Sequence, residues 1–222
     1  MLKRLLSYIS PITIKKIPSE VNKRLEITYN DGQLVLDTPN TNFSFGSLET
    51  VMRKGLKYIG YSKIEPMNNI LILGLGGGSI LKLLRKEVKY NGAITSVELD
   101  PAILFVAKKY FDLEQYSDKH TIVEGDAFEF MLKQKEHYDL IVIDIFQDYK
   151  MPIFLYESYF VDKVKDSLNI NGFILFNTIA LDKEDKDRNK QYVSLFESDK
   201  FSVRTHPKIQ DLNELMTIKR FA

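Results

Sequence analysis

A glycine-rich loop between an apolar strand and a helix constrains the fold of this chain most. The apolar residues 70–73 predict a buried strand, and residues 80–86 predict a helix. Glycines in this setting let the backbone turn tightly and let a ligand approach the amides at the start of the helix. The alternative is a turn that only packs helix against strand, and the strand–helix context favours ligand binding. The loop consists of Gly74, Leu75, Gly76, Gly77 and Gly78.

Short apolar strands alternate with helices after Pro66. This pattern predicts an α/β domain with a seven-stranded, mostly parallel sheet and helices on both faces. The last two strands are compatible with an antiparallel pair at one edge. The charge-rich residues 182–190 are expected to form a solvated loop or the start of a helix. The expected strands are 70–73, 94–97, 121–123, 140–143, 173–176, 201–204 and 215–218, and the expected helices are 80–86, 101–110, 127–133, 159–168 and 190–197.

The first part of the chain has a different, β-rich pattern. Residues 25–29 and 33–37 alternate between apolar and polar around the turn Asn30-Asp31-Gly32, which predicts a hairpin. Residues 47–58 then show helical spacing of apolar side chains. We therefore expect two units, a β-hairpin and helix subdomain over 1–65 and a main domain over 66–222.

Two acidic residues follow the second strand of the main domain. A carboxylate at a strand tip roughly 20 residues after a glycine loop can bind the hydroxyls of a ribose. Glu98 is therefore the predicted ribose ligand, and we place its neighbour Leu99 in the same site. Asp100 precedes Pro101, and this order favours a helix N-cap.

The third strand is followed by Asp126 and Ala127. The carboxylate of Asp126 can accept a hydrogen bond from an adenine amino group, while the amide of Ala127 serves a ring nitrogen. A helix cap is an equal alternative, because an expected helix begins at Ala127. The combination with Glu98 and the glycine loop favours the ligand interpretation.

The fourth strand carries Asp144 to the carboxyl edge of the sheet, where open α/β sheets bind ligands. A carboxylate after an apolar run is an improbable core residue, because burying an unpaired charge is costly. Asp144 and nearby Asp148 are the candidate catalytic residues, and Asp144 is also a candidate cofactor contact. An aromatic cluster nearby is either the wall of a substrate pocket or a buried packing face, with equal weight. It consists of Phe146, Tyr149, Phe154, Tyr156, Tyr159 and Phe160.

Composition excludes several other classes of protein. The 222 residues carry a formal net charge of +1, which argues against a nucleic-acid binder with a broad basic field. Cysteine is absent, and His120, His137 and His206 lie outside any metal-ligand spacing, so we expect no metal. No apolar run reaches about 18 residues, so no membrane partner is expected. Residues 1–6 are too short for a secretory signal and are expected to pack on the domain of a cytoplasmic protein.

The order of these features resembles the spermidine synthase-like family within the class I S-adenosylmethionine-dependent methyltransferase superfamily. The glycine loop, Glu98 and Asp126 carry the resemblance, together with the segments 42–48, 138–144, 157–160 and 171–172. The resemblance implies a Rossmann-like class I methyltransferase fold. It also implies S-adenosylmethionine or its decarboxylated form as cofactor, a small-molecule substrate, and a possible homodimer.

Three departures from the family pattern bear on the group that is transferred. Aminopropyl-transferring members carry an aspartate where this chain has Gly77, whereas glycine amides suit the carboxylate of intact S-adenosylmethionine. Gln147 stands where the family has its catalytic aspartate, with Asp148 one position further. Phe45 and Ser47 stand where polyamine-making members have a tyrosine and an acid. The resemblance therefore implies methyl or aminopropyl transfer to a small nucleophile, with spermidine synthesis from putrescine as an alternative.

Two further functions share part of the pattern. An NAD-dependent dehydrogenase also has a glycine loop and a second-strand acid, but Ser79 occupies the position of its third glycine. A non-catalytic relative would keep the nucleoside site for sensing or scaffolding, which the altered residues after Asp144 allow.

Overall fold

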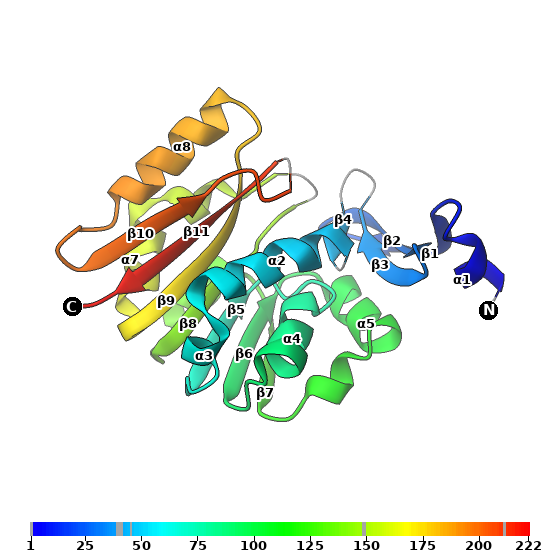
Figure 1. Cartoon of the computed structure of the whole chain (residues 1–222), viewed down its shortest axis with the longest axis horizontal. Coiled ribbons are helices and arrows are strands. Elements are labelled where there is room, and N and C mark those ends of the chain that lie inside the picture. Colours follow the sequence, from blue (N-terminus) through cyan, green and yellow to red (C-terminus); the bar gives the residue numbers. More distant parts are fainter. Residues whose placement is uncertain (1, 39–41, 45, 148–149, 211) are drawn as a thin grey trace.

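A computed structural model describes residues 2–38, 42–44, 46–147, 150–210 and 212–222 (Figure 1). A small sheet and the N-terminal segment lie at one end of the molecule. The large sheet extends to the other end, where β10 (Phe201–His206), β11 (Asn213–Arg220) and α8 (Lys183–Ser194) are found (Figure 1).

The large sheet has seven strands in the order β10-β11-β9-β8-β5-β6-β7. The pairs among β5 to β9 are parallel, and β11 runs antiparallel to both β9 and β10. The predicted mostly parallel sheet is thus confirmed, with the last two strands as its antiparallel edge pair. The strands are β5 (Asn69–Leu73), β6 (Ala93–Glu98), β7 (His120–Glu124), β8 (Tyr138–Ile143), β9 (Leu168–Ile179), β10 (Phe201–His206) and β11 (Asn213–Arg220).

Eight α-helices lie in the described residues, and two of these helices have the predicted bounds. They are α5 (Pro101–Tyr110) and α6 (Ala127–Lys133). The others are α1 (Leu2–Leu6), α2 (Gly46–Ile59), α3 (Tyr61–Ile64), α4 (Ser79–Leu83), α7 (Ser158–Asp166) and α8 (Lys183–Ser194). Short turns of other helix types are η1 (Leu84–Val88), η2 (Leu113–Tyr116) and η3 (Ile153–Tyr156).

The prediction for α8 was wrong in its bounds. The helix covers Lys183–Ser194 instead of 190–197, so the charged run forms its first half. Asp182 caps it by accepting a hydrogen bond from the Asp185 amide at 2.9 Å. The helix is largely polar and buries only Asn189 and Tyr192 among its residues, so apolar spacing gave little signal for its start.

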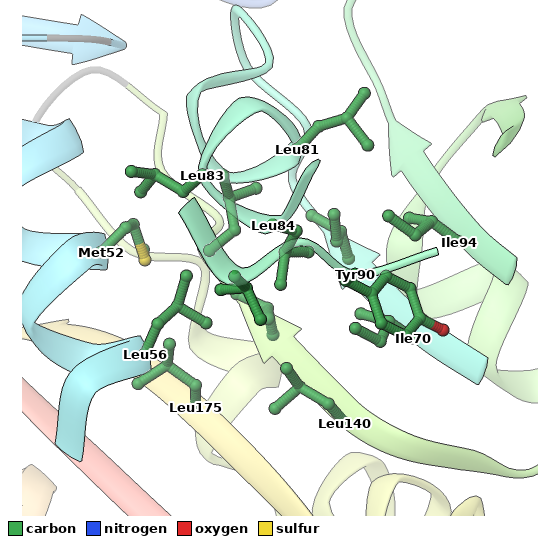
Figure 2. Packing of buried hydrophobic residues seen from close by; sticks show 14 of the residues in the cluster. Met52, Leu56, Ile70, Leu81, Leu83, Leu84, Tyr90, Ile94, Leu140 and Leu175 are labelled. Carbon is green, nitrogen blue, oxygen red and sulfur yellow. The ribbon is translucent and has the colours of Figure 1, made fainter. Parts of the chain in front are cut away.

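Alternating side chains of each central strand enter different cores on the two faces of the large sheet. In β5, Ile70 and Ile72 belong to the first cluster, whereas Leu71 and Leu73 belong to the second. Figure 2 shows the first cluster, in which Leu56 of α2 packs near the sheet. The second cluster includes side chains of α6, α7 and α8. Helices therefore cover both faces, as predicted.

The small sheet contains the predicted hairpin. Its antiparallel strands lie in sequence order and are β1 (Ile12–Ser19), β2 (Lys23–Asn30), β3 (Gln33–Asp37) and β4 (Asn42–Ser44). Asp31 and Gly32 form the turn with φ values of 48° and 72°, and Asn30 pairs with Gln33. Positive φ at both central residues suits the right-handed twist of a hairpin.

The small sheet packs on α5 of the main domain. Leu25, Ile27 and Leu36 form one cluster with Ile103 and Val106. Helix α2, which belongs to the first predicted unit, packs in the core of the large sheet. The division of the chain between residues 65 and 66 stays a prediction.

The N-terminal segment is attached by hydrogen bonds. Arg4 Nε donates to the Gly32 carbonyl at 2.9 Å, and Ser7 Oγ accepts from the Gly32 amide at 3.0 Å. Its apolar side chains stay exposed, Leu2 at 69% and Ile9 at 87%. The N-terminal segment is therefore held on the domain by polar groups instead of by these apolar side chains. Across the described ranges, no helix is long and apolar enough to span a membrane.

Candidate active site

The glycine loop adopts a backbone that only glycine accommodates easily. Gly74, Gly76 and Gly78 have φ values of 90°, 55° and 91°. A Cβ atom on Gly74 would lie 2.1 Å from the carbonyl oxygen of Asp144. The side chain of Leu75 is buried in the core, so this residue offers a ligand its backbone. The loop is therefore shaped by backbone contacts with the end of β8.

Glu98 lies at the end of β6 and holds this loop. Its Oε2 accepts from the Gly76 amide at 2.9 Å, and its Oε1 accepts from the Asp100 amide at 3.0 Å. Burial raises the pKa of Glu98, and these backbone hydrogen bonds oppose the shift. The neighbouring Leu99 is 39% exposed and presents an apolar surface beside the acid. The structure thus brings the predicted ribose ligand into contact with the predicted loop.

Asp100 is a helix N-cap, as predicted. Its Oδ1 accepts from the Ala102 amide at 2.9 Å at the start of α5. Its Oδ2 accepts from Ser19 Oγ at 2.5 Å and from Asn22 Nδ2 at 3.0 Å. These two partners come from the small sheet and its first turn, and no local sequence pattern indicates them.

Asp126 caps α6. Its Oδ1 accepts from the amides of Phe128 at 2.7 Å and Glu129 at 3.1 Å, so the helix-cap alternative is observed. Both of these hydrogen bonds end on Oδ1, and neither occupies Oδ2. The Gly125 amide donates to the Glu98 carbonyl at 2.9 Å, which places Asp126 close to the end of β6. The adenine-binding role of Asp126 and Ala127 stays a prediction.

Asp144 stands beside the glycine loop at the end of β8. Its amide donates to the Leu73 carbonyl at 2.9 Å, and its Oδ1 accepts from Asn177 Nδ2 at 3.0 Å. Burial raises the pKa of Asp144 to about 7, and the nearby charge of Glu98 acts in the same direction. A carboxyl group with this pKa is suited to exchange protons near neutral pH.

The second catalytic candidate, Asp148, lies outside the described residues. On either side of positions 148–149, Gln147 and Lys150 exchange backbone hydrogen bonds of 2.8 Å and 3.0 Å. The structure therefore brings Asp144, Glu98 and the glycine loop together.

Asn177 and Asn213 belong to this region and were not predicted. Asn177 in β9 is fully buried, and its Oδ1 accepts from Asn213 Nδ2 at 3.0 Å. The sequence signal was a polar Asn177-Thr178 pair directly after the apolar residues 173–176. The predicted strand ends at residue 176, whereas β9 continues to Ile179.

The aromatic cluster is mainly a packing face. The rings of Phe128, Phe154 and Phe160 pack against one another, with centroid distances of 5.5, 5.0 and 6.3 Å for the pairs 128–154, 154–160 and 128–160. Tyr156 shares a hydrogen bond of 2.8 Å with Thr178 Oγ1. Phe146 is partly buried, Tyr159 is 55% exposed, and Tyr149 lies outside the described residues.

Two of the histidines have local hydrogen-bond partners. His120 Nε2 lies 2.9 Å from Ser96 Oγ, and His206 Nε2 lies 3.0 Å from Thr217 Oγ1. Burial lowers the pKa of His120 to about 4. In the part of the chain that the structure describes, no group of three or more His, Cys, Asp or Glu side chains is placed to hold a metal ion.

The strand order and the loop after β5 define a class I S-adenosylmethionine-dependent methyltransferase fold, and solved structures share it. Spermidine synthase from Thermotoga maritima superimposes with a TM-score of 0.72 at 20% identity, over 95% of this chain and 73% of that one. Human methyltransferase-like protein 13, solved in complex with S-adenosylhomocysteine (SAH), gives 0.63 at 21% identity, over 79% and 82% of the chains.

The chain belongs to the spermine/spermidine synthase family, because the family model "Spermine/spermidine synthase domain" matches residues 50–207. A relative from Bifidobacterium longum, named probable polyamine aminopropyl transferase, is 31% identical over 147 residues. That match covers 62% of this chain and 32% of the relative. The chain thus spans less than half of the length of the curated relatives it matches first.

Proposed function

We propose that this chain binds S-adenosylmethionine and transfers its methyl group to a small nucleophile. The observation that carries this proposal is the contact between the glycine loop and Glu98, with Asp144 directly beside the loop. A relative of the same fold is solved with SAH, the product that remains after methyl transfer. When bound, S-adenosylmethionine supplies an electrophilic methyl carbon on a sulfonium centre.

The buried carboxylate of Glu98 fits a ribose. The two oxygens of a carboxylate offer about four acceptor positions, and the amides of Gly76, Asp100 and Leu99 use three of them in Glu98. A position is left for a hydroxyl donor, so Glu98 can hold the loop and a ribose hydroxyl together. The loop amides around Gly77 would receive the carboxylate of the cofactor, and Asp126 with Ala127 would receive the adenine.

Asp144 is the proposed proton acceptor. A nucleophile that attacks the methyl carbon must lose a proton, and a carboxyl group with a pKa of about 7 can take it near neutral pH. The remaining work is positioning, because a bound nucleophile in line with the methyl carbon reacts as if it were highly concentrated. Asp148 remains a second candidate for this role.

Aminopropyl transfer from decarboxylated S-adenosylmethionine is the second candidate function. The family and the Bifidobacterium relative favour it. Gly77 argues against it, because this position offers no carboxylate to hold the free amine of the decarboxylated cofactor. Transfer to putrescine would make the chain a spermidine synthase. A nucleoside-binding relative without activity is the third candidate.

Calorimetric titration with both cofactors tests the proposal. We expect S-adenosylmethionine to bind more tightly than its decarboxylated form. Glu98→Gln should weaken binding by about 10-fold to 100-fold, because hydrogen bonds to a charged acceptor are lost. Glu124→Gln is the matched control, since Glu124 is exposed at the end of the next strand and pairs with Glu98 in the register. It should leave the affinity unchanged.

The opposite outcomes identify the other candidates. Tighter binding of the decarboxylated cofactor with turnover of putrescine would establish aminopropyl transfer. Binding without turnover across a panel of amines and other small nucleophiles would favour a sensor or scaffold. A change in NADH fluorescence without S-adenosylmethionine binding would revive the dehydrogenase alternative.

A further inference from the structure

Three polar side chains form a row across three neighbouring strands of the large sheet. Asn213 Nδ2 of β11 donates to Asn177 Oδ1 of β9 at 3.0 Å. Asn177 Nδ2 then donates to Oδ1 of Asp144, at the end of β8, again at 3.0 Å. The order of the side chains follows the order of the strands, β11-β9-β8. Asn177 at the centre is completely buried.

The hydrogen bonds of this row run in one direction, with each donor on the Asn213 side and each acceptor on the Asp144 side. An amide side chain has an acceptor oxygen and a donor nitrogen, so the group that meets each end fixes its orientation. The ionised carboxylate of Asp144 presents only acceptors, so it fixes the donor end of Asn177, and Asn213 meets the Asn177 oxygen with its own donor nitrogen. A flipped Asn177 amide would set its NH2 group against that of Asn213 and its oxygen against the carboxylate. Both contacts would be repulsive in a buried place, so the observed orientation is strongly favoured.

This row determines which oxygen of Asp144 is free for ligand. Oδ1 is held by Asn177, so Oδ2 is the oxygen that this hydrogen bond leaves unoccupied. On the other side, the backbone of Asp144 lies against Gly74. A proton acceptor needs a fixed position relative to the group that loses the proton, and such positions come from neighbouring hydrogen bonds.

We propose that Asn177 and Asn213 are positioning residues that hold Asp144 with Oδ2 toward the reacting end of the bound cofactor. This inference rests on the proposed function. The row also acts on the charge of Asp144. A donated hydrogen bond favours the ionised carboxylate, whereas burial and the charge of Glu98 favour the protonated form. Loss of the Asn177 donor should therefore raise the pKa of Asp144 further.

The test is a titration of the Asp144 carboxyl carbon by NMR in protein labelled with 13C-aspartate, with Asp144→Asn to assign the signal. We expect a pKa of about 7 in the unchanged protein. Asn177→Leu, which keeps the size but removes the donor, should lower the acid dissociation constant by about tenfold. Asn213→Ala should lower the acid dissociation constant of Asp144 by a smaller factor. This variant keeps the Asn177 donor and removes only the group that bonds to the Asn177 oxygen.

The chain offers a matched control in Asn189. This asparagine is also buried, and it bonds to Thr178 Oγ1, the Ile179 carbonyl and Glu214 within the same region. Asn189→Leu should reduce stability and leave the Asp144 titration in place. If Asn189→Leu shifted the titration as much as Asn177→Leu, the role would be general packing and the inference would be overturned.

The titration is independent of the proposed function. Cofactor binding is measured separately by calorimetry on the same proteins. An unchanged titration in both Asn177→Leu and Asn213→Ala overturns the positioning row while leaving the methyl-transfer proposal standing. Failure of the unchanged protein to bind S-adenosylmethionine overturns the proposed function, whatever the carboxyl titration shows. If Asn177→Leu fails to fold, Asn213→Ala decides the outcome by itself.

Discussion

Ser19 Oγ donates a hydrogen bond of 2.5 Å to Asp100 Oδ2, although the two residues are 81 positions apart in the chain. The same carboxylate caps α5, and the amide of Asp100 donates to Glu98. The first turn of the small sheet is therefore linked through one buried side chain to the acid that we propose holds the ribose. This carboxylate thus joins the small sheet to the end of β6.

Replacement of Asp100 tests the strength of this link. Asp100→Ala removes a helix cap and the acceptor of the hydrogen bonds from Ser19 Oγ and Asn22 Nδ2. We expect a loss of about 3 kcal/mol in the free energy of unfolding, measured with urea. Asp182→Ala, which removes the exposed cap of α8, should cost only about 1 kcal/mol. Equal losses in the two variants would show that capping alone accounts for the effect.

The glycine loop predicts a contrast between two glycine substitutions. Gly74→Ala places a methyl group 2.1 Å from the Asp144 carbonyl oxygen at a φ of 90°, so the backbone must move. We expect a loss of about 3 kcal/mol or more in stability. Gly125→Ala meets nothing within 4 Å and should change stability by less than about 1 kcal/mol. Thermal and urea unfolding would measure both, and a tolerated Gly74→Ala would contradict the described loop.

The raised pKa of Asp144 predicts how stability depends on pH. Between the ordinary value of 3.8 and about 7, the folded protein keeps a proton on Asp144 that the unfolded chain has released. The contribution of Asp144 to the free energy of unfolding is therefore fully present below pH 4 and is lost as the pH rises to 7. The loss amounts to at most about 4 kcal/mol.

Asp144→Asn removes this titration. The variant should gain stability relative to the unchanged protein as the pH rises from 4 to 7, and the difference should level off above pH 8. Urea unfolding at a series of pH values measures the difference. A difference that is the same at every pH would contradict the raised pKa.

The choice of cofactor should respond to Gly77. Its φ lies outside the left-handed region in which this loop's other glycines are found, so an aspartate there meets no backbone strain. Gly77→Asp should lower the ratio of affinities for S-adenosylmethionine and its decarboxylated form by about tenfold or more. The added carboxylate repels the carboxylate of S-adenosylmethionine, and it attracts the amine of the decarboxylated form. Gly77→Asn is the uncharged control, and equal effects of both variants would point to size instead of charge.

The sequence predicted the parts of the fold that depend on local patterns. The helices 101–110 and 127–133 have the expected bounds, because a capping aspartate precedes each one. Each core strand of the large sheet was found, because buried parallel strands are continuously apolar. Glu98 and Asp144 were placed correctly at the ends of their strands, since the carboxyl edge of such a sheet collects these positions.

The features that were missed depend on partners far away in the chain. The predicted strand 173–176 ends where the continuous apolar run ends, so residues 177–179 lie outside it. Asn177 remains in β9 because Asn213 and Asp144 satisfy its amide. The second role of Asp100 was missed for the same reason, since Ser19 and Asn22 are distant in sequence. Periodicity carries no information about such pairs.

Gly74 touches the carbonyl of Asp144 through its backbone alone, and this has an evolutionary consequence. The fit between the two strand ends is independent of the side chains that follow Asp144, such as Gln147. The side chains after Asp144 can therefore be replaced one at a time during evolution while the glycine loop keeps its structure. Descendants of one ancestor can in this way come to modify different molecules with the same inherited loop.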